Sequence, residues 1–358
     1  MNICLARMMW IGSAALLFLI LAILGFLCFC TLREFHPAGS EILKIHGYPG
    51  EMTGARSDFT FLTWNIGYAG LGKEMDFFYD GGKRSRSTRH EFERYYKEIK
   101  EIILRHRAID FILLQEVDNR SRRSFFTDET KGISDLLPGH SFSFAINYRC
   151  DFVPVPITDP VGRVHSGLMT FSTFRPDSSI RIGLDLPVSW PKRLFYLKRC
   201  FIISRFSLPG KKELLIVNIH LSAFDTGGIW RTRELEKLRD FLVPEYKKGN
   251  YIVAGGDWNA NPPGFSPEQI TSGDKVKTDP FLSPDTFFPG WKFASDSTRP
   301  TNRDLIGPYE KGITKTTILD FYLVSPNVTI REVKTIETGF RSSDHQPVSL
   351  TISLNDLP

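Results

Sequence analysis

Apolar residues recur along the chain with two different periods, and these periods separate strands from helices. Residues 59–64, Phe-Thr-Phe-Leu-Thr-Trp, alternate with a period of two and are rich in β-forming residues, which predicts a strand. Residues 91–107 carry apolar side chains at helical spacing with charges between them, which predicts an amphipathic helix packed on a sheet. A second helix is predicted over residues 230–242, with three leucines on its buried face.

Shorter apolar runs predict the remaining strands. They cover residues 109–115, a strand pair within 142–172 around a loop at 147–156, a hairpin of 200–206 and 214–219, and the segments 251–254, 318–324, 328–338 and 347–354. Residues 262–317 are rich in Pro, Asp and Thr with little periodicity, so we expect mostly loop there, as we do for residues 76–89.

The N-terminal segment differs from the rest of the chain. Residues 8–30 contain no charged residue, and at about 1.5 Å per residue they are long enough to cross a hydrocarbon core of about 30 Å. We therefore expect a short tail over 1–7, a transmembrane anchor over 8–30, a linker over 31–57 and one globular domain over 58–358. A cleaved signal peptide is the alternative, but the run exceeds the usual ~7–15 apolar residues and no small-x-small site follows it. A lipid attachment at Cys28 or Cys30 is a weaker interpretation, because a bulky residue precedes each cysteine.

Composition and charge set only broad limits. The chain has 358 residues, 42% hydrophobic and 24% charged, which suits one domain of roughly 300 residues or two smaller ones. Its formal charge of +5 favours approach to phosphate-bearing partners without identifying one. Arg7 precedes the apolar span and Arg33 follows it beside Glu34, so the positive-inside bias is nearly balanced. Because an N-terminal anchor with a short leading tail usually leaves its bulk outside the cytoplasm, we expect an extracytoplasmic domain.

Cysteines do not decide the compartment. Of five, only two lie in the globular part, Cys150 and Cys200. One disulfide between them and two free, packed thiols are both compatible with the sequence.

Polar residues recur at or next to the ends of predicted strands. They are Asn65, Glu116, His220, Asp257, Asn259, Asp320, Asp344 and His345. Each has an ordinary explanation on its own, since a strand-end acid is often solvated and Gly-Asp-x-Asn also suits a turn that caps its own backbone. Along an extended backbone Asp257 and Asn259 would point to the same side, and Asp320 inside an apolar strand would be costly unless paired. Their joint recurrence favours a single site at one edge of a sheet.

Basic residues in the loops are further candidates for substrate contact. Arg149 and Arg163 flank strands that head for the same edge, so a substrate-facing role for one of them stands beside simple solvent exposure. The basic run over residues 83–89 is either solvated surface or a contact for an anionic substrate. We expect no special role for His165.

Six motifs of this chain resemble those of the endonuclease/exonuclease/phosphatase superfamily. They are Thr63-Trp-Asn-Ile66, Leu114-Gln-Glu-Val117, Val217-Asn-Ile-His-Leu-Ser222, Gly256-Asp-Trp-Asn259, Ile318-Leu-Asp-Phe321 and Ser343-Asp-His-Gln-Pro347, in the family's order. The superfamily includes pancreatic-type DNases, abasic-site endonucleases, inositol polyphosphate 5-phosphatases and neutral sphingomyelinases. The resemblance implies an α/β (α+β) fold, a four-layer α/β/β/α sandwich of two mixed sheets flanked by helices, with the site at one edge of the two sheets.

The resemblance also implies a metal site. Glu116 would be the primary ligand of Mg²⁺, with Asn65 close by, Asp344 as a further contributor and Mn²⁺ as a substitute ion. Hard oxygen ligands of this kind suit magnesium, which takes few carboxylates and keeps several waters. One or two metal ions are both compatible with the motifs.

The other motif residues would act on the phosphate and the attacking water. His345 would be the general base or an imidazolium that clamps the phosphate, oriented by Asp320. Asp257 would activate or orient the water, and Asn259 and His220 would hydrogen-bond the phosphate.

These implications predict a membrane-anchored, magnesium-dependent phosphoesterase that hydrolyses a phosphodiester or phosphomonoester with an activated water. An anchor favours a lipid headgroup as substrate, and a membrane-tethered or extracytoplasmic nuclease is the alternative. A non-catalytic binding module that has kept the fold is the hypothesis from another class. The loops that separate family members, at 71–89, 148–166 and 257–317, contain no motif for one substrate. We expect a monomeric catalytic domain.

Overall fold

The strands of the protein form two large sheets that pack face to face. The computed structural model describes residues 3–52, 56–184, 187–223, 225, 228–283, 287 and 289–356. Sheet A contains, in spatial order, β1 (Ser40–Ile42), β6 (Ser178–Gly183), β7 (Cys200–Leu208), β8 (Lys212–His220), β9 (Tyr251–Asp257), β14 (Asp320–Val324) and β11 (Lys292–Ala294). Sheet B contains β15 (Val328–Thr335), β16 (Val348–Leu354), β2 (Asp58–Asn65), β3 (Phe111–Asp118), β5 (Gly162–Ser172) and β4 (Ser141–Val153). A small third sheet consists of β10 (Lys275–Val276), β13 (Lys315–Thr317) and β12 (Asn302–Arg303).

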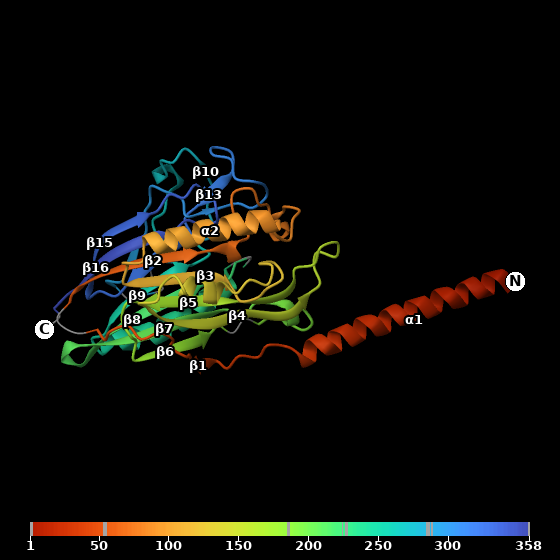
Figure 1. Ribbon diagram of the computed structural model, residues 1–358, viewed down its shortest axis with the longest axis horizontal. Helices are drawn as coiled ribbons and strands as arrows, with labels where there is room; N and C mark the ends of the chain where they lie inside the picture. Colours follow the sequence, from red (N-terminus) through yellow and green to blue (C-terminus); the bar gives the residue numbers. More distant parts are fainter. Residues whose placement is uncertain are drawn as a thin grey trace.

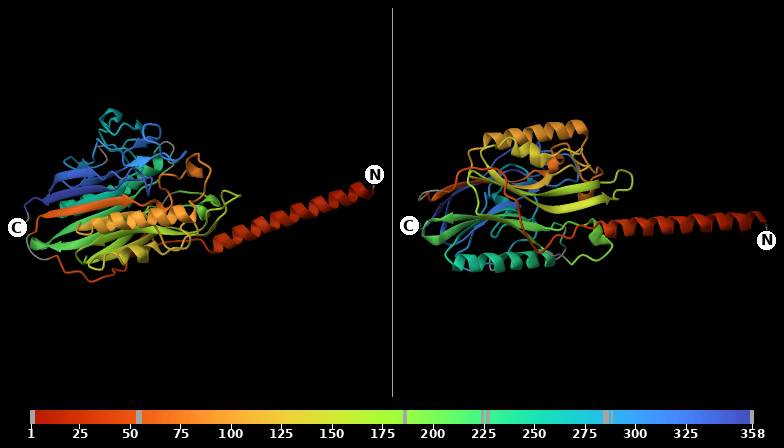
Figure 2. Two further views of the ribbon diagram at one scale, coloured as in Figure 1. Left: turned by 45° about the horizontal axis from the view of Figure 1, so that its top comes forward. Right: turned by 60° about the horizontal axis from the view of Figure 1, so that its bottom comes forward.

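Helices cover the outer faces of both sheets (Figures 1 and 2). The face of sheet B away from sheet A packs against α2 (Arg89–Arg105) and α3 (Glu129–Ser134), and sheet A packs against α4 (Ile229–Lys247). Helix α2 begins at a capping box, in which Thr88 and Glu91 each bind the other's backbone N–H. This arrangement confirms the predicted four-layer sandwich of two mixed sheets, with parallel pairs β2–β3 and β8–β9 among antiparallel neighbours.

The alternation in β2 explains why both faces of sheet B are buried. Phe59 and Phe61 enter the core between the sheets, whereas Leu62 and Trp64 pack under the helices. Across the inter-sheet core the rings of Phe61 and Tyr322 lie 6.2 Å apart between centroids.

Polar contacts also join the two sheets across this core. Gln115 of β3 donates to the side-chain oxygen of Asn218 on β8 at 2.7 Å, and Asn218 donates in turn to the carbonyls of Leu114 and Met169. All of these groups are fully buried, so their hydrogen bonds fix the relative position of the two sheets, while Gln115 Oε1 has no partner among the described residues. Sequence analysis did not single out either amide.

The structure differs from the predicted elements in a few places. Residues 147–153 continue β4 and pair with β5, although a loop was predicted there. The strand β6 and the helix α3 were not predicted, and the expected loop at 262–317 contains several short strands. Residues 40–42 of the expected linker form β1, which pairs with β6 at the edge of sheet A. These segments are short or polar, so tertiary pairing rather than local periodicity sets their conformation.

Helix α1 (Ile3–Leu32) projects away from the domain (Figures 1 and 2). From Arg7 to Leu32 it is long and apolar enough to cross a membrane, and most of its described side chains are exposed. Cys150 and Cys200 are buried and free, so the alternative of two packed thiols holds.

The end of the domain away from the strand-end motifs is held by a buried carboxylate. Glu245, in the last turn of α4, accepts hydrogen bonds from Arg205 at 2.8 Å, Lys248 at 2.9 Å and Asn250 at 2.9 Å. Burial raises the pKa of Glu245, but the hydrogen bonds from Arg205 and Lys248 outweigh it and lower the pKa to about 2. The cluster joins α4 to β7 and to the start of β9.

We predict that this carboxylate makes stability depend on acid pH. A depressed folded-state pKa gives stability that is present above about 4.5, the ordinary pKa of Glu, and is lost as the pH falls toward about 2. Urea unfolding of the full chain in detergent should therefore show a midpoint that falls more steeply between pH 5 and pH 3 than that of Glu245→Gln. Glu236→Gln, at an exposed position of the same helix, should keep the wild-type slope. Equal slopes for all three proteins would contradict the assignment.

Candidate active site

The polar strand-end residues meet because the ends of neighbouring strands meet. Parallel pairing places His220 at the end of β8 opposite Asp257 at the end of β9, and antiparallel pairing places Asp257 opposite Asp320. In sheet B the end of β2 at Asn65 pairs with Gln115, one residue before Glu116. The two sheets thus bring their functional side chains to one common edge.

Asp257 lies at the centre of this edge. Its Oδ2 accepts a hydrogen bond from Asn65 Nδ2 at 3.0 Å, and its Oδ1 accepts one from the backbone N–H of Asn259 at 2.9 Å. The Nε2 atoms of His220 and His345 lie 3.3 and 3.7 Å from Oδ2. The carboxylate is 1% exposed, so these four neighbours replace the water it has lost.

His345 and Asp320 form a buried pair. His345 Nδ1 donates to Asp320 Oδ2 at 2.7 Å, while the other ring nitrogen lies 3.0 Å from the side-chain amide of Asn302. Burial lowers the pKa of His345, but the charges of Asp320, Asp257 and Asp344 outweigh it and raise the pKa well above its usual value. Burial also raises the pKa of Asp320 to about 6, although His345 opposes this rise. The pair therefore holds a proton near neutral pH, and this contact explains how an acid can lie inside an apolar strand.

The pKa of His220 is shifted in the opposite direction from that of His345. Burial lowers the pKa of His220 well below its usual value, and the positive charges of Arg199 and His345 lower it further. A neutral ring can present Nε2–H to Asp257, while Nδ1 has no hydrogen-bond partner among the described residues. The two histidines beside one carboxylate are therefore in different protonation states.

Glu116 is aimed into the site by an irregularity in β3. The register between β3 and β5 shifts between Leu114 and Val117, and Glu116 has a left-handed φ of +54°. A non-glycine residue seldom adopts this conformation, and such local strain clusters at functional sites. The Glu116 carboxylate accepts a hydrogen bond from Asn65 at 3.3 Å and remains partly exposed.

Asp344 is the second carboxylate on this side. Burial raises the pKa of Asp344 to about 7, with Glu116 adding to the rise and His345 opposing it. Its Oδ1 lies where a side chain at Gly67 would come within 2.9 Å, so the absence of a side chain there leaves room for the carboxylate. Burial and the charge of Glu116 disfavour ionisation of Asp344, and both residues offer hard oxygen donors, so they fit a divalent cation such as Mg²⁺, which would stabilise the charged form of Asp344.

A second group could also hold an ion by spacing alone. Donor atoms of Asp257, Asp320 and His345 all lie within 4.8 Å of one another. Asp320 and His345 already satisfy each other through their 2.7 Å hydrogen bond, however, and Asp320 is fully buried. The partly exposed Glu116 side of the edge is therefore the better candidate for the cation. Asn65 turns its amide nitrogen toward the carboxylates and its oxygen toward the N–H of Gly67.

Asn259 reaches the site in a different way from the one expected. β9 ends at Asp257, and Asn259 has a left-handed φ of +48°, so the extended geometry does not continue to it. Its amide nitrogen donates to the carbonyl of Leu221 at 2.9 Å, and its backbone N–H binds Asp257. The segment is thus a turn that caps Asp257 as well as part of the catalytic edge.

The arginine candidates are not brought into the cluster. Arg149 and Arg163 are both exposed on the β4–β5 hairpin, and Arg149 lies 5.9 Å from the ring centroid of Phe35. Within the described parts of the chain, neither guanidinium forms a hydrogen bond or an ion pair with the acidic residues of the edge. The basic run over 83–89 pairs with the protein itself through Arg84–Glu91 and Arg86–Asp159.

Sequence analysis missed Asn302 and Arg199. Asn302 lies in the segment without periodicity, so no local pattern pointed to it. Arg199 lies just before β7 in a basic stretch. The pairing of β7 with β8 brings Arg199 near His220, and the sequence alone does not reveal that pairing.

Comparisons with known proteins agree with this arrangement. A model of the Endonuclease/Exonuclease/phosphatase family matches residues 62–345. Among solved structures, the chain is similar to ANGEL2, a 2′,3′-cyclic phosphatase in complex with adenosine-2′,3′-vanadate, with a TM-score of 0.54 and 14% identity over 87% of this chain and 98% of that one. It is also similar to the human Nocturnin catalytic domain with bound sulfate, with a TM-score of 0.51 and 16% identity over 87% and 97% of the two chains.

A third similar structure is an endonuclease/exonuclease/phosphatase from Beutenbergia cavernae DSM 12333, with a TM-score of 0.51 and 14% identity over 85% of this chain and 73% of that one. At these identities the likeness concerns the fold. A comparison with curated protein sequences finds no match. The family match covers most of the chain, including every motif residue at the edge of the two sheets. The chain therefore belongs to the Endonuclease/Exonuclease/phosphatase family, whose members are metal-dependent hydrolases of phosphoric esters.

Proposed function

We propose that the protein is a membrane-anchored, magnesium-dependent phosphoesterase that cleaves a phosphodiester or phosphomonoester with an activated water. The observation that carries this proposal is the buried Asp257 carboxylate, which has a neutral histidine on one side and a protonated histidine–aspartate pair on the other. A base, a cationic clamp and hydrogen-bond donors around one point are what hydrolysis of a phosphate ester needs.

The residues of the edge divide the work. Asp257 orients the attacking water and accepts its proton, because it is the carboxylate that both histidines face. His345, held by Asp320 and kept positive by its acidic neighbours, clamps the phosphate oxygens as charge develops on them. The Nε2–H of the neutral His220 ring is shared between Asp257 and the phosphate, and Asn259 donates to the phosphate with the amide N–H that does not bind Leu221. Asn302 steadies the ring of His345 from the other side.

Glu116 and Asp344, with Asn65 beside them, would hold Mg²⁺ or Mn²⁺. A bound cation supplies Lewis acidity to the phosphate oxygens and relief of the charge on the leaving group. The Asn65 amide donates to both Glu116 and Asp257, so it holds the two carboxylates at a fixed separation.

The anchor and the catalytic edge lie on the same side of the domain. One row of paired residues crosses sheet A from Ser40 through Ile182, Phe201 and Ile219 to Gly256. Ser40 follows α1 closely and Gly256 precedes Asp257, so α1 joins the domain at the same end of sheet A as the catalytic residues. The distance from Ser40 to Gly256 is roughly 20 Å, because four strand-to-strand steps of about 4.8 Å separate them.

This placement favours an ester in a membrane lipid over a nucleic acid as substrate. We propose that the domain is extracytoplasmic. A protease added to intact cells should then digest the domain, and full protection would contradict this orientation.

We predict that His345→Ala lowers the rate of hydrolysis of bis-p-nitrophenyl phosphate by about 10²–10⁴-fold, because the variant loses the charge that clamps the phosphate. His90→Ala, at an exposed position of α2, is the matched control and should retain the wild-type rate. EDTA should abolish the wild-type activity. Full activity in EDTA, or in folded His345→Ala, would refute the proposed mechanism.

We predict that Glu116→Gln raises the Mg²⁺ concentration needed for half-maximal rate about tenfold or more, because a charged ligand is lost. Its readout is a titration of activity with Mg²⁺ and with Mn²⁺. Glu93→Gln, exposed on α2, should keep the wild-type titration. An unchanged midpoint in Glu116→Gln would move the metal site elsewhere, for example to the Asp257 group.

We predict that the full chain in vesicles hydrolyses sphingomyelin or phosphoinositides faster than it relaxes supercoiled DNA or cleaves nucleotides, all assayed with Mg²⁺. Deletion of residues 1–32 should reduce the rate on lipid in vesicles while leaving bis-p-nitrophenyl phosphate hydrolysis in place. Faster cleavage of DNA than of every lipid would favour the alternative, a membrane-tethered nuclease.

A further inference from the structure

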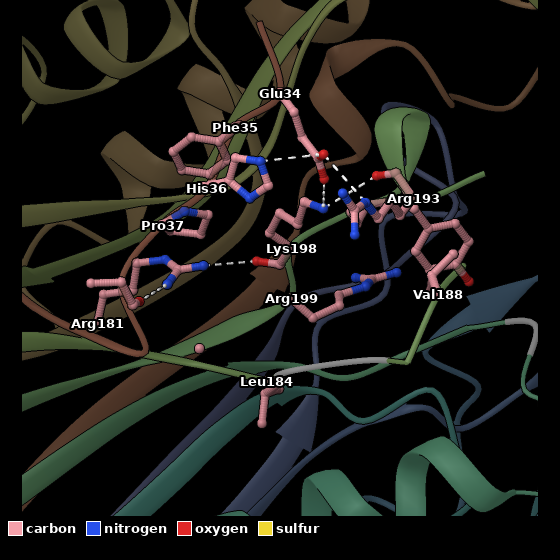
Figure 3. A pocket seen from close by; sticks show the side chains of 14 residues that line it. Glu34, Phe35, His36, Pro37, Arg181, Leu184, Val188, Arg193, Lys198 and Arg199 are labelled. Carbon is pink, nitrogen blue, oxygen red and sulfur yellow. Dashed lines mark hydrogen bonds and ion pairs between the residues drawn. The ribbon is translucent and has the colours of Figure 1, made fainter. Parts of the chain in front are cut away.

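A positively charged cavity lies at the foot of α1. Its volume is about 260 Å³, and it opens between the segment that follows α1 and the loop that leads into β7 (Figure 3). Its basic lining residues are Arg181, Arg193, Lys198 and Arg199, with His36 beside them. None of the strand-end residues from Asn65 to His345 lines it, and Arg199 borders both this cavity and His220, so the cavity is a second site next to the catalytic edge.

The cavity has more positive than negative charge. Glu34 is the acid that lines it, and this carboxylate pairs with Lys198 at 2.8 Å and with Arg193 at 3.4 Å. Arg181 is occupied by backbone carbonyls, including those of Ile146 at 3.0 Å and Lys198 at 2.9 Å. Among the residues that the structure describes, one lining acid therefore faces four strong bases.

Arg199 forms neither a hydrogen bond nor an ion pair with the residues that the structure describes, although the buried carboxylate of Glu234 is close enough to interact with its charge. Arg199 is only 7% exposed, and its buried Nη1 has no hydrogen-bond partner among the residues that the structure describes. An unpaired guanidinium in a buried position is costly unless an anion binds it. Figure 3 shows Arg199 on the wall of the cavity, near Lys198 and across from Glu34.

Apolar side chains surround the foot of α1 near the cavity, as expected for a region that contacts a membrane surface. Phe26, near the end of α1, lies 6.1 Å from the rings of both Phe152 and Phe195, so the foot of the helix packs on the domain. Trp190, which donates a hydrogen bond to Thr31 of α1 at 3.2 Å, is 49% exposed, and Ile157 in the turn between β4 and β5 is 92% exposed. Exposed apolar groups beside a spanning helix, with a basic cavity among them, suit the interface between acyl chains and headgroups.

We propose that this cavity binds the phosphate-bearing headgroup of an anionic phospholipid, with Arg199 and Arg193 on the phosphate. The proposal rests on the membrane anchoring proposed above and concerns a site distinct from the one that performs hydrolysis. A volume of about 260 Å³ exceeds what a bare phosphate needs and leaves room for the rest of a headgroup.

Lipid binding in this cavity would fix the orientation of the domain relative to the bilayer. Phe201 pairs with Ile219, so Arg199, two residues before Phe201, lies beside the end of β8 at His220. A headgroup held by Arg199 would fix this corner against the membrane and keep the catalytic edge turned toward it. The anchor alone allows rotation about its own axis, whereas a second attachment point removes that freedom.

The test is binding of dioctanoyl phosphatidylglycerol to the full chain in neutral detergent, measured by titration calorimetry. We expect saturable binding at one site, binding of dioctanoyl phosphatidylcholine at least tenfold weaker, and a loss of about tenfold in affinity for phosphatidylglycerol in Arg199→Gln and in Arg193→Gln. Lys211→Gln, exposed at the turn between β7 and β8 on the opposite end of the domain, should bind as the wild type does. Unchanged affinity in both arginine variants would overturn the proposal.

Further measurements distinguish a lipid headgroup from free phosphate as the ligand, and the headgroup site from the proposed hydrolytic function. Equal binding of glycerol 3-phosphate or inorganic phosphate would overturn the lipid assignment in favour of a free phosphate. Hydrolysis of bis-p-nitrophenyl phosphate is measured on the same samples, and Arg193→Gln should keep the wild-type rate. Absent lipid binding with intact hydrolysis contradicts only the headgroup site, whereas intact binding without hydrolysis contradicts only the proposed function.

Discussion

The burial of one carboxylate, Asp257, constrains the whole catalytic edge. A charged group that is 1% exposed must be surrounded by donors, and its donors come from both sheets. Asn65 and His345 belong to sheet B or its flanks, whereas His220 and Asn259 come from the sheet A side. The site therefore exists only while the two sheets keep their relative position, which the buried Gln115–Asn218 contact and the aromatic core behind the edge maintain.

Electrostatic differences over a few ångströms then give similar residues different roles. His345 faces three acids and is held in its charged form, whereas His220 is buried beside positive groups and stays neutral. Burial and the charge of Glu116 raise the pKa of Asp344, which makes this side of the edge suitable for a cation. In the proposed function, the Glu116 side of the site takes the cation and the histidine side takes the phosphate.

The position of α1 links the fold to the proposed membrane setting. Helix α1 enters the domain along the same row of sheet A that ends next to Asp257, and the β4–β5 hairpin extends beyond the end of β3 at that edge. Anchor, basic cavity and catalytic residues therefore share one end of the molecule. An opposite direction of β1 would have placed the anchor beside the Glu245 cluster, far from the site.

The sequence by itself determined the strands with clear alternation, the helices α2 and α4, the apolar span and the strand-end residues from Asn65 to His345, because these depend on local periodicity and on motifs. Only the tertiary structure decided the β1 and β6 strands, the turn at Asn259, and the absence of Arg149 from the acidic cluster, because these depend on pairing between distant segments. Asn302 and Arg199 belong to the same class. The roles of these two side chains depend on neighbours from other strands, and no periodic pattern in the sequence shows which residues those neighbours are.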